Sequence, residues 1–174
     1  MILILTGPVH AGKTTFLKNL LPVFRSREIP VCGYLSLPVL KQARTWGYDL
    51  FDFKTGRSVP LLRREGRPGW QKVGPYFFLP AGLQAAENII RGCPAGERLI
   101  VDEVGPQELA GRGVWPALSA ALSRPEIACL LVVRESLIDE LRCLLGNRPV
   151  EVFDIAAENT LLTLPERLSK PAGK

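Results

Sequence analysis

The sequence predicts an α/β fold with a mostly parallel sheet and helices on both faces. Short continuous apolar runs, such as residues 2–6 and 127–133, are typical of strands that are buried on both sides. Segments with apolar side chains at three- and four-residue spacing alternate with these runs, as they do in βαβ units. The chain has 174 residues, of which 47% are hydrophobic. This is enough for one buried core, so we expect a single domain over residues 1–170.

The first elements follow directly from this pattern. Residues 2–6 form an apolar run that ends at a Gly-Pro pair, which predicts the first strand. From Phe16 onward, apolar side chains recur at helical spacing, which predicts a helix that ends near Arg25. Pro22 lies inside that pattern and favours an earlier end or a bend. Residues 31–37 are the second strand candidate.

The middle of the chain predicts an antiparallel insertion on the sheet, at about residues 33–62. Residues 46–53 and 57–62 alternate loosely in hydropathy around a Thr-Gly turn, which is typical of a hairpin. The following residues 63–74 are rich in arginine, glycine and proline, and we expect them to form a mobile basic loop.

The second half of the chain continues the alternation. Apolar runs predict three further strands, at residues 99–101, 127–133 and 150–153. Periodic segments predict four further helices, at residues 80–90, 114–122, 137–145 and 157–168. Ser136 is expected to cap the helix at 137–145.

One segment has the pattern G-x-x-x-x-G-K-[ST] between the first strand and the first helix, which is the context that this phosphate-binding motif requires. The segment is Gly7-Pro8-Val9-His10-Ala11-Gly12-Lys13-Thr14, and we expect these residues and Thr15 to bind a nucleotide. The glycines let the backbone wrap around phosphate. Successive N–H groups and the positive end of the helix then form an anion nest.

Two side chains of this motif are expected to act directly on the nucleotide. Lys13 places a cation on the β- and γ-phosphates, and the Thr14 hydroxyl is a ligand for Mg²⁺. His10 either approaches a phosphate or the base, or points to solvent, and we favour solvent.

A pair of acids follows the predicted strand at residues 99–101. An acid at the end of a hydrophobic strand is the second half of an NTPase site, and Asp102 would hold Mg²⁺ through water. Glu103 would orient and deprotonate the attacking water. A water-activating glutamate at this place favours a hydrolase over a kinase. The alternative to this site is that Asp102 and Glu103 form a solvated acidic turn without a catalytic role.

Arg134 directly follows the apolar run at residues 127–133. The carboxyl ends of parallel strands line the ligand crevice of an open sheet, so Arg134 is placed to reach the γ-phosphate as an arginine finger in cis. Equally, it is placed to pair with Glu135 or Asp139 at the surface.

The net charge of +5 is a local feature. Residues 54–72 contain six basic residues and one acid, and the rest of the chain holds 16 of each. This segment favours a polyphosphate or nucleic acid partner, or it is a solvated loop.

The cysteines and the apolar stretches indicate which metal sites, disulfides and cellular locations to expect. Four cysteines are present and no two are two residues apart, so a zinc site is not expected. We expect Cys32 and Cys129 to be small buried side chains and expect no disulfide framework. No apolar stretch approaches the roughly 20 residues that span a bilayer. We therefore expect a cytoplasmic monomer without membrane contact.

Four segments resemble the small P-loop nucleoside-triphosphatase family of the thermophile type, which includes the human cancer-related nucleoside-triphosphatase. The resemblance runs from Met1 to about Leu168. Its segments are the loop 7–15, Cys32-Gly33-Tyr34 with Gly47-Tyr48-Asp49, Val73-Gly74-Pro75-Tyr76, and the most specific one, Val101-Asp102-Glu103-Val104-Gly105-Pro106-Gln107-Glu108-Leu109.

The resemblance implies a RecA-like α/β domain with an antiparallel insertion. It implies slow, Mg²⁺-dependent hydrolysis of ATP, GTP and other nucleoside triphosphates to diphosphate and phosphate. It also implies polar roles for Glu108 and Arg134. Two features depart from the family: residues 36–40 lack the usual acidic stretch, and Gln107 replaces the usual methionine.

Two other functions remain open on the sequence. One is a nucleotide or small-metabolite kinase in which Arg63, Arg64 and Arg67 cover the phosphates. The other is a non-catalytic nucleotide sensor that binds a partner or RNA through the basic loop. No Asn-Lys-x-Asp or Leu-Ser-Gly-Gly segment occurs, which disfavours a guanine-specific switch and a transporter subunit.

Overall fold

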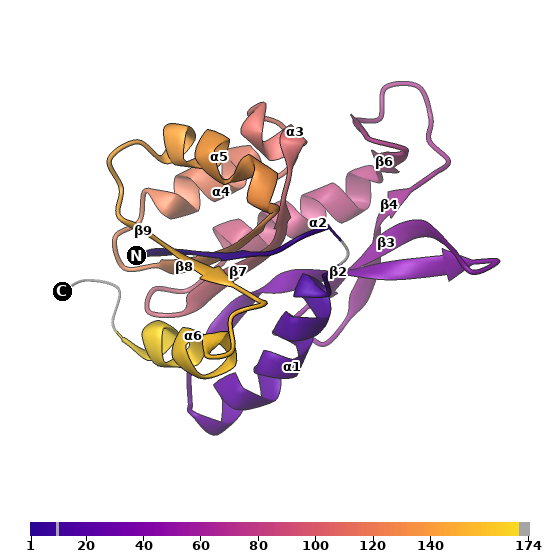
Figure 1. Ribbon diagram of the computed structural model, residues 1–174. Coiled ribbons are helices and arrows are strands. Elements are labelled where there is room, and N and C mark those ends of the chain that lie inside the picture. The colour runs from indigo at the N-terminus through magenta and orange to yellow at the C-terminus, as the bar shows by residue number, and fades with distance from the viewer. Residues whose placement is uncertain (10, 171–174) are drawn as a thin grey trace.

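The computed structural model describes residues 1–9 and 11–170, so the expectation for His10 lies outside the described residues. These residues build one nine-stranded sheet in the order β5-β6-β4-β3-β2-β7-β8-β1-β9 (Figure 1). Its strands are β1 Ile2–Thr6, β2 Val31–Lys41, β3 Arg44–Asp52, β4 Ser58–Arg63, β5 Lys72–Val73, β6 Tyr76–Phe78, β7 Arg98–Val104, β8 Ala128–Val133 and β9 Val150–Asp154. Its helices are α1 Lys13–Ser26, α2 Pro80–Arg91, α3 Pro106–Leu109, α4 Trp115–Leu122, α5 Ile138–Leu145 and α6 Thr160–Ser169.

The strands β2, β7, β8, β1 and β9 form a parallel half-sheet that is covered on both sides. Successive residues of a strand face opposite sides, and in β1 Ile4 joins one core cluster while Leu3 and Leu5 join the other. All six residues of β8 are buried. The continuous apolar runs therefore reflect strands with a core on each face, and the predicted α/β class is confirmed.

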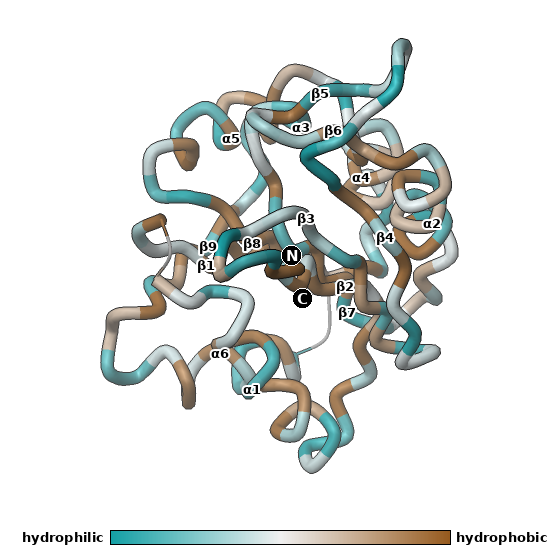
Figure 2. Tube along the Cα trace, turned by 90° about the vertical axis from the view of Figure 1, so that its right-hand side faces the viewer, coloured by the Kyte–Doolittle hydropathy of each residue, from teal (hydrophilic) through white to brown (hydrophobic). Residues whose placement is uncertain are grey.

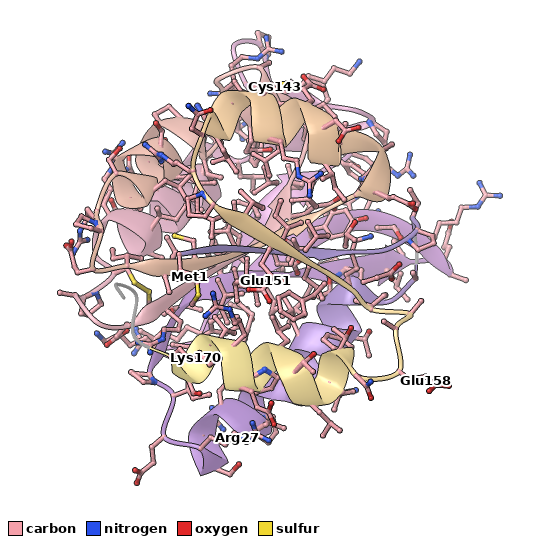
Figure 3. The ribbon with its side chains drawn as sticks, turned by 60° about the vertical axis from the view of Figure 1, so that its left-hand side comes forward. Met1, Arg27, Cys143, Glu151, Glu158 and Lys170 are labelled. Atoms are coloured by element: carbon pink, nitrogen blue, oxygen red, sulfur yellow. A yellow bond between two sulfur atoms is a disulfide. The ribbon has the colours of Figure 1, made fainter. Side chains whose placement is uncertain are left out.

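The helices divide between the two faces. In Figure 1, α1 and α6 lie on one side of the sheet, and α2, α4 and α5 lie on the other. Leu17, Leu20 and Phe24 of α1 pack with Leu164 of α6 in one cluster. Figure 3 shows Cys143, on α5, at the opposite side of the molecule from Arg27, which follows α1. Helices therefore cover both faces, as the sequence predicts.

The other half of the sheet is antiparallel and is larger than a single hairpin. The expected hairpin forms between β3 and β4. β3 also pairs with β2, and β6 and β5 continue the sheet beyond β4. The sheet thus has four antiparallel and four parallel strand pairings. The short strands β5 and β6 carry no alternation that the sequence alone reveals, since each has at most three residues.

Two details of the helices differ from the sequence expectation. α1 continues through Pro22 to Ser26, and the proline lies on its exposed side. Ser136 does not cap α5: it lies within a 3₁₀ turn, Glu135–Leu137, and α5 begins at Ile138. This turn shifts the helix start past the serine, so the propensity of serine for N-caps does not locate the cap here.

The expectation that no disulfide forms is wrong, because Cys32 of β2 is bonded to Cys93, which follows α2. Their Cα atoms lie 5.9 Å apart although 61 residues separate them in sequence. Packing of α2 against the sheet brings them together, and spacing along the chain does not reveal this. Cys129 is free and buried, as expected, and Cys143 is free and exposed.

Hydropathy follows the layers. Figure 2 shows the middle of the molecule, around β2, β7 and β8, in hydrophobic colours. Within the part of the chain that the structure describes, every helix is too short or too polar to cross a bilayer.

Candidate active site

Between β1 and α1, Gly7 and Gly12 have backbone conformations that suit a phosphate-binding loop. Gly7 and Gly12 have φ angles of 151° and 88°, in the region that favours glycine. A Cβ atom on Gly7 would lie 2.8 Å from Cγ1 of Ile155, so no larger residue fits without displacement. Glycine is therefore required at Gly7 by both conformation and space.

Lys13 is the first residue of α1 and its side chain folds back over this loop. Its Nζ donates hydrogen bonds to the carbonyl oxygens of Gly7 and Pro8, at 2.8 and 2.9 Å. Only 9% of the residue is exposed. Among the described residues, no side chain caps Gly12 and no acid lies in the first turn of α1. The free N–H groups and the positive helix end are therefore available to an anion beside Lys13.

Asp102 lies on β7 across from this loop and is 2% exposed. Its Oδ2 accepts a hydrogen bond from the Ser36 backbone N–H at 3.1 Å, and the Ser36 hydroxyl donates to its carbonyl oxygen. Burial raises the pKa of Asp102 to about 7, and the Ser36 N–H, the Thr14 hydroxyl and the charge of Lys13 each act to lower it. The predicted partners Thr14, Lys13 and Asp102 are therefore neighbours.

A β-bulge places Asp102 and Glu103 at the same site. In a regular strand, consecutive side chains point to opposite faces. Here Val101 pairs with Leu131 and Val104 with Val133, so β7 holds one residue more than β8 in this interval. Bulges re-aim side chains in this way next to active sites. Both acids consequently line one cavity.

Glu103 forms an ion pair with Arg134, whose Nε lies 2.6 Å from Glu103 Oε1. Arg134 therefore does not pair with Glu135 or Asp139, the surface partners considered from the sequence. β7 and β8 are parallel neighbours, so the residues at their carboxyl ends meet at the same edge of the sheet. Both side chains stay partly exposed, at 44% for Arg134 and 33% for Glu103.

These groups surround a cavity of about 440 Å³. The predicted residues that line it are Val9, the run from Ala11 to Thr15, Asp102, Glu103 and Arg134. Gly7 and Pro8 contribute through the carbonyl groups that hold Lys13. Apart from His10, the structure therefore brings the residues predicted to bind nucleotide, Mg²⁺ and water to one place, while Glu108 lies outside this cavity.

The cavity also contains residues that were not predicted to belong to the site. Lys18 lies one turn after Thr14 on α1 and lines the cavity. Residues four apart share one face of a helix, so this spacing could have predicted Lys18 as a site residue. Ser36 and Tyr48 come from β2 and β3. Their presence depends on how the antiparallel half pairs with β7, for which the sequence offers no signal.

The basic segment lies beside the cavity rather than over it. Arg63 pairs with Asp49 at 2.6 Å and lies over the ring of Trp46. Arg64 and Arg67 lie over Tyr76 and Trp70. Of the described residues that line the 440 Å³ cavity, none is one of these three arginines. This arrangement does not place the arginines over the phosphates, as the kinase alternative requires.

The oxygen atoms at the site suit a magnesium ion. Mg²⁺ prefers hard oxygen ligands and keeps several waters. Thr14, with its hydroxyl, and Asp102, with its carboxylate, line the same cavity. Among the described residues, the one other candidate ligand group is Cys32, Cys93 and Glu97, and its two sulfurs are bonded to each other.

Comparisons with known proteins agree with this geometry. A family model described as NTPase matches residues 2–167. The human cancer-related nucleoside-triphosphatase is 28% identical over 177 residues, covering 93% of this chain and 92% of that protein. The nucleoside-triphosphatase THEP1 of Methanopyrus kandleri is 32% identical over 178 residues, covering 94% and 97%.

Two solved structures share the fold. The solution structure of the human cancer-related nucleoside triphosphatase has a TM-score of 0.72 and 27% identity, and covers 96% of this chain and 95% of that one. The crystal structure of THEP1 from Aquifex aeolicus has a TM-score of 0.69 at 20% identity, which shows the shared fold alone. Since the family model spans nearly the whole sequence, this chain belongs to the NTPase family.

Proposed function

We propose that this protein hydrolyses nucleoside 5′-triphosphates to diphosphate and phosphate, and that the reaction depends on Mg²⁺. The observation that supports this most is the meeting of Lys13, Thr14, Asp102 and Glu103 in one cavity. The names of the relatives, nucleoside-triphosphatase in each case, support the same reaction.

Phosphate binding is assigned to the loop 7–12 and the first turn of α1. The N–H groups at the helix start would surround the β-phosphate, and Lys13 would exchange its contacts with the loop carbonyls for phosphate oxygens. Thr14 and Asp102 would hold Mg²⁺, Asp102 through water. The ion, when bound, would neutralise charge on the β- and γ-phosphate oxygens.

Glu103 is assigned as the base that takes a proton from the attacking water. Its ion pair with Arg134 holds its carboxylate at the cavity edge. The guanidinium of Arg134 has further N–H groups that are free to contact the γ-phosphate, where negative charge gathers during transfer. One residue therefore orients the base and stabilises the developing charge.

Broad base selectivity, including ATP and GTP, is part of the proposal. From β2, Leu37, Pro38 and Leu40 line the cavity beside Ser36, whose N–H and hydroxyl are already bonded to Asp102. Leu37, Pro38 and Leu40 have no hydrogen-bonding groups with which to distinguish adenine from guanine.

The proposal is tested by following phosphate release from each nucleoside triphosphate with and without Mg²⁺. Lys13→Ala and Glu103→Gln are the paired variants. Phosphate release should fall on the order of 10²–10⁴-fold in Glu103→Gln. Nucleotide binding, followed with a fluorescent analogue, should be retained in Glu103→Gln and weakened in Lys13→Ala. Tight binding with no release by the unaltered protein would instead favour a nucleotide sensor.

A second candidate function, binding of single-stranded nucleic acid, is supported by cations that stack on the aromatic rings of the antiparallel half. Trp46 has Lys41 and Arg63 over its ring, at 5.3 and 5.0 Å. Aromatic rings interleaved with basic side chains suit stacked bases and a phosphate backbone. Anisotropy with labelled oligo(U) should show affinity that falls steeply with salt and is weakened by Arg67→Glu. Salt-independent or absent binding would contradict this function.

A cytoplasmic location and a monomeric state stay predictions from the sequence. Disulfides are rare in a reducing compartment, so the Cys32–Cys93 bond argues against a cytoplasmic location.

A further inference from the structure

A second cavity, of about 270 Å³, adjoins the nucleotide cavity. The two cavities share five wall residues: Ser36, Tyr48, Asp102, Glu103 and Arg134. Among the described residues of loop 7–12 and α1, none lines the second cavity. It is therefore not part of the phosphate-binding loop, yet it opens against the same pair of acids.

This cavity forms where the antiparallel half of the sheet meets α3. Leu61 and Leu62 of β4 and Phe78 of β6 form an apolar wall, and Val114 faces it from before α4. Figure 2 shows α3 beside β5 and β6, and the Gln107 side chain of α3 donates to the Lys72 carbonyl oxygen at 2.9 Å. The walls of the cavity therefore come from parts of the chain that are distant in sequence. The hydrogen bond from Gln107 to Lys72 connects two of them.

Aromatic side chains line the end next to the nucleotide cavity. The rings of Tyr48 and Tyr76 lie edge-to-face with centroids 5.4 Å apart. Tyr34 is 2% exposed and also lines the cavity. Burial raises its pKa well above the ordinary value, and the charges of Glu108 and Asp102 add to this effect. Such rings suit the flat faces of an aromatic ligand.

The charged groups of this cavity are mostly acids. Glu108 is 5% exposed, and its Oε2 and Oε1 accept hydrogen bonds from the Gly105 and Val114 N–H groups, at 3.0 and 3.3 Å. Asp102 and Glu103 are the other two acids, so three acids line the cavity against one basic residue among those described, Arg134. A cationic ligand is therefore favoured and an anionic ligand is disfavoured.

We propose that the second cavity binds a small aromatic molecule with an amine and a hydroxyl group, and that this molecule accepts the γ-phosphoryl group. The inference rests on the proposed function of the neighbouring site. The acceptor hydroxyl oxygen forms a bond to the γ-phosphorus, and the bond from that phosphorus to the β,γ-bridging oxygen breaks. Glu103 takes the hydroxyl proton, and the products are a phosphate monoester and a nucleoside diphosphate. Water takes the place of the hydroxyl when the cavity holds no acceptor.

Three probes that differ only in the end of one side chain test the charge preference. Tyramine carries an ammonium, tyrosol an alcohol and 4-hydroxyphenylacetate a carboxylate, each on the same phenol. Calorimetric titration of the full chain with Mg²⁺ and ADP should give the tightest binding for tyramine, about tenfold tighter than for the carboxylate. Equal affinity of the three, or no binding of any, would overturn the proposal.

Substitutions in the cavity wall test whether tyramine binds in the second cavity. Val73 lines the second cavity only, and Val73→Phe should fill it and weaken tyramine binding at least about tenfold. The matched control is Val39→Phe, at a half-buried valine of β2 that lines neither cavity. Glu108→Gln should weaken binding of tyramine more than binding of tyrosol. Circular dichroism and ADP binding show whether each variant is folded. Tyramine binding that survives both Val73→Phe and Glu108→Gln would place the ligand elsewhere and end the proposal.

Transfer is followed by ³¹P NMR with ATP, Mg²⁺ and tyramine. A phosphate monoester signal that grows at the expense of inorganic phosphate supports the acceptor role. Tyramine that binds in the cavity while only inorganic phosphate forms would overturn that role. Hydrolysis without any added probe is measured in parallel, so that failure of the proposed NTP hydrolysis is distinguished from failure of this inference.

Discussion

Arg134 Nε and Glu103 Oε1 lie 2.6 Å apart across the carboxyl ends of β8 and β7. The two side chains stand in the wall that the two cavities share. In the proposed reaction, the pair connects the base, Glu103, with a cation that contacts the γ-phosphate. Both side chains are partly exposed, so the pair contributes little to stability and its importance is expected in catalysis.

Arg134→Ala should reduce the rate of NTP hydrolysis on the order of 10²-fold, because it removes both the partner of Glu103 and a cation beside the γ-phosphate. The dissociation constant for the diphosphate should change little. Steady-state phosphate release measures the rate, and Arg142→Ala is the control, since Arg142 pairs weakly with the exposed Asp139 at 3.9 Å. Equal activity of the two variants would rule out a catalytic role for Arg134.

Glu108 should make the protein relatively more stable at acidic pH. Burial raises the pKa of Glu108 above its ordinary 4.5, so the folded state binds its proton more tightly than the unfolded state does. The stabilisation is complete below pH 4.5 and is lost as the pH rises through the raised folded-state pKa. Urea denaturation from pH 4 to 8 should show a steeper loss of stability for the unaltered protein than for Glu108→Gln. Parallel curves would contradict the assignment.

Reduction of the Cys32–Cys93 disulfide should lower the free energy of unfolding by up to about 4 kcal/mol, because the bond closes a loop across 61 residues. Thermal unfolding with and without a phosphine reductant measures the loss. Cys143→Ser serves as the background, since the exposed Cys143 thiol is free to exchange with the disulfide. The variant Cys32→Ala/Cys93→Ala should be insensitive to reductant; the same melting shift in that variant would point to another cause.

Gly33→Ala should destabilise the fold by more than about 3 kcal/mol. Gly33 has a φ of 125°, and a Cβ there would lie 1.9 Å from the carbonyl oxygen of Ile100 on the neighbouring strand. The backbone would have to separate β2 from β7 in the middle of the sheet. Gly56→Ala is the matched control, because its φ is also positive but no atom lies within 4 Å of the added Cβ. A similar urea midpoint for both variants would contradict this account.

Local patterns in the sequence were enough for the α/β class and for the phosphate-binding loop. Three features follow one another directly in the sequence: the apolar run of β1, the Gly7 to Thr14 motif and the periodic face of α1. A short stretch of sequence is therefore enough to predict this strand, loop and helix. Asp102 and Glu103 were predicted as site residues because the phosphate-binding motif earlier in the chain favours this interpretation of an acidic pair over a solvated turn.

Other features depended on contacts between distant segments. The Cys32–Cys93 bond, the Arg134–Glu103 pair and the hydrogen bond from Ser36 to Asp102 join residues 61, 31 and 66 positions apart. The order of strands in the sheet decides each of these contacts, and spacing along the chain does not encode that order.

The sequence by itself determined the phosphate-binding motif, because its loop and the helix end that follows are formed by neighbouring residues. The tertiary structure alone decided that a bulge turns Asp102 and Glu103 toward one site, and that a second cavity lies behind them. Both result from the pairing of β7 with β8 and the meeting of the antiparallel strands with α3. Pairing and packing are relations between surfaces, which exist only once the chain has folded.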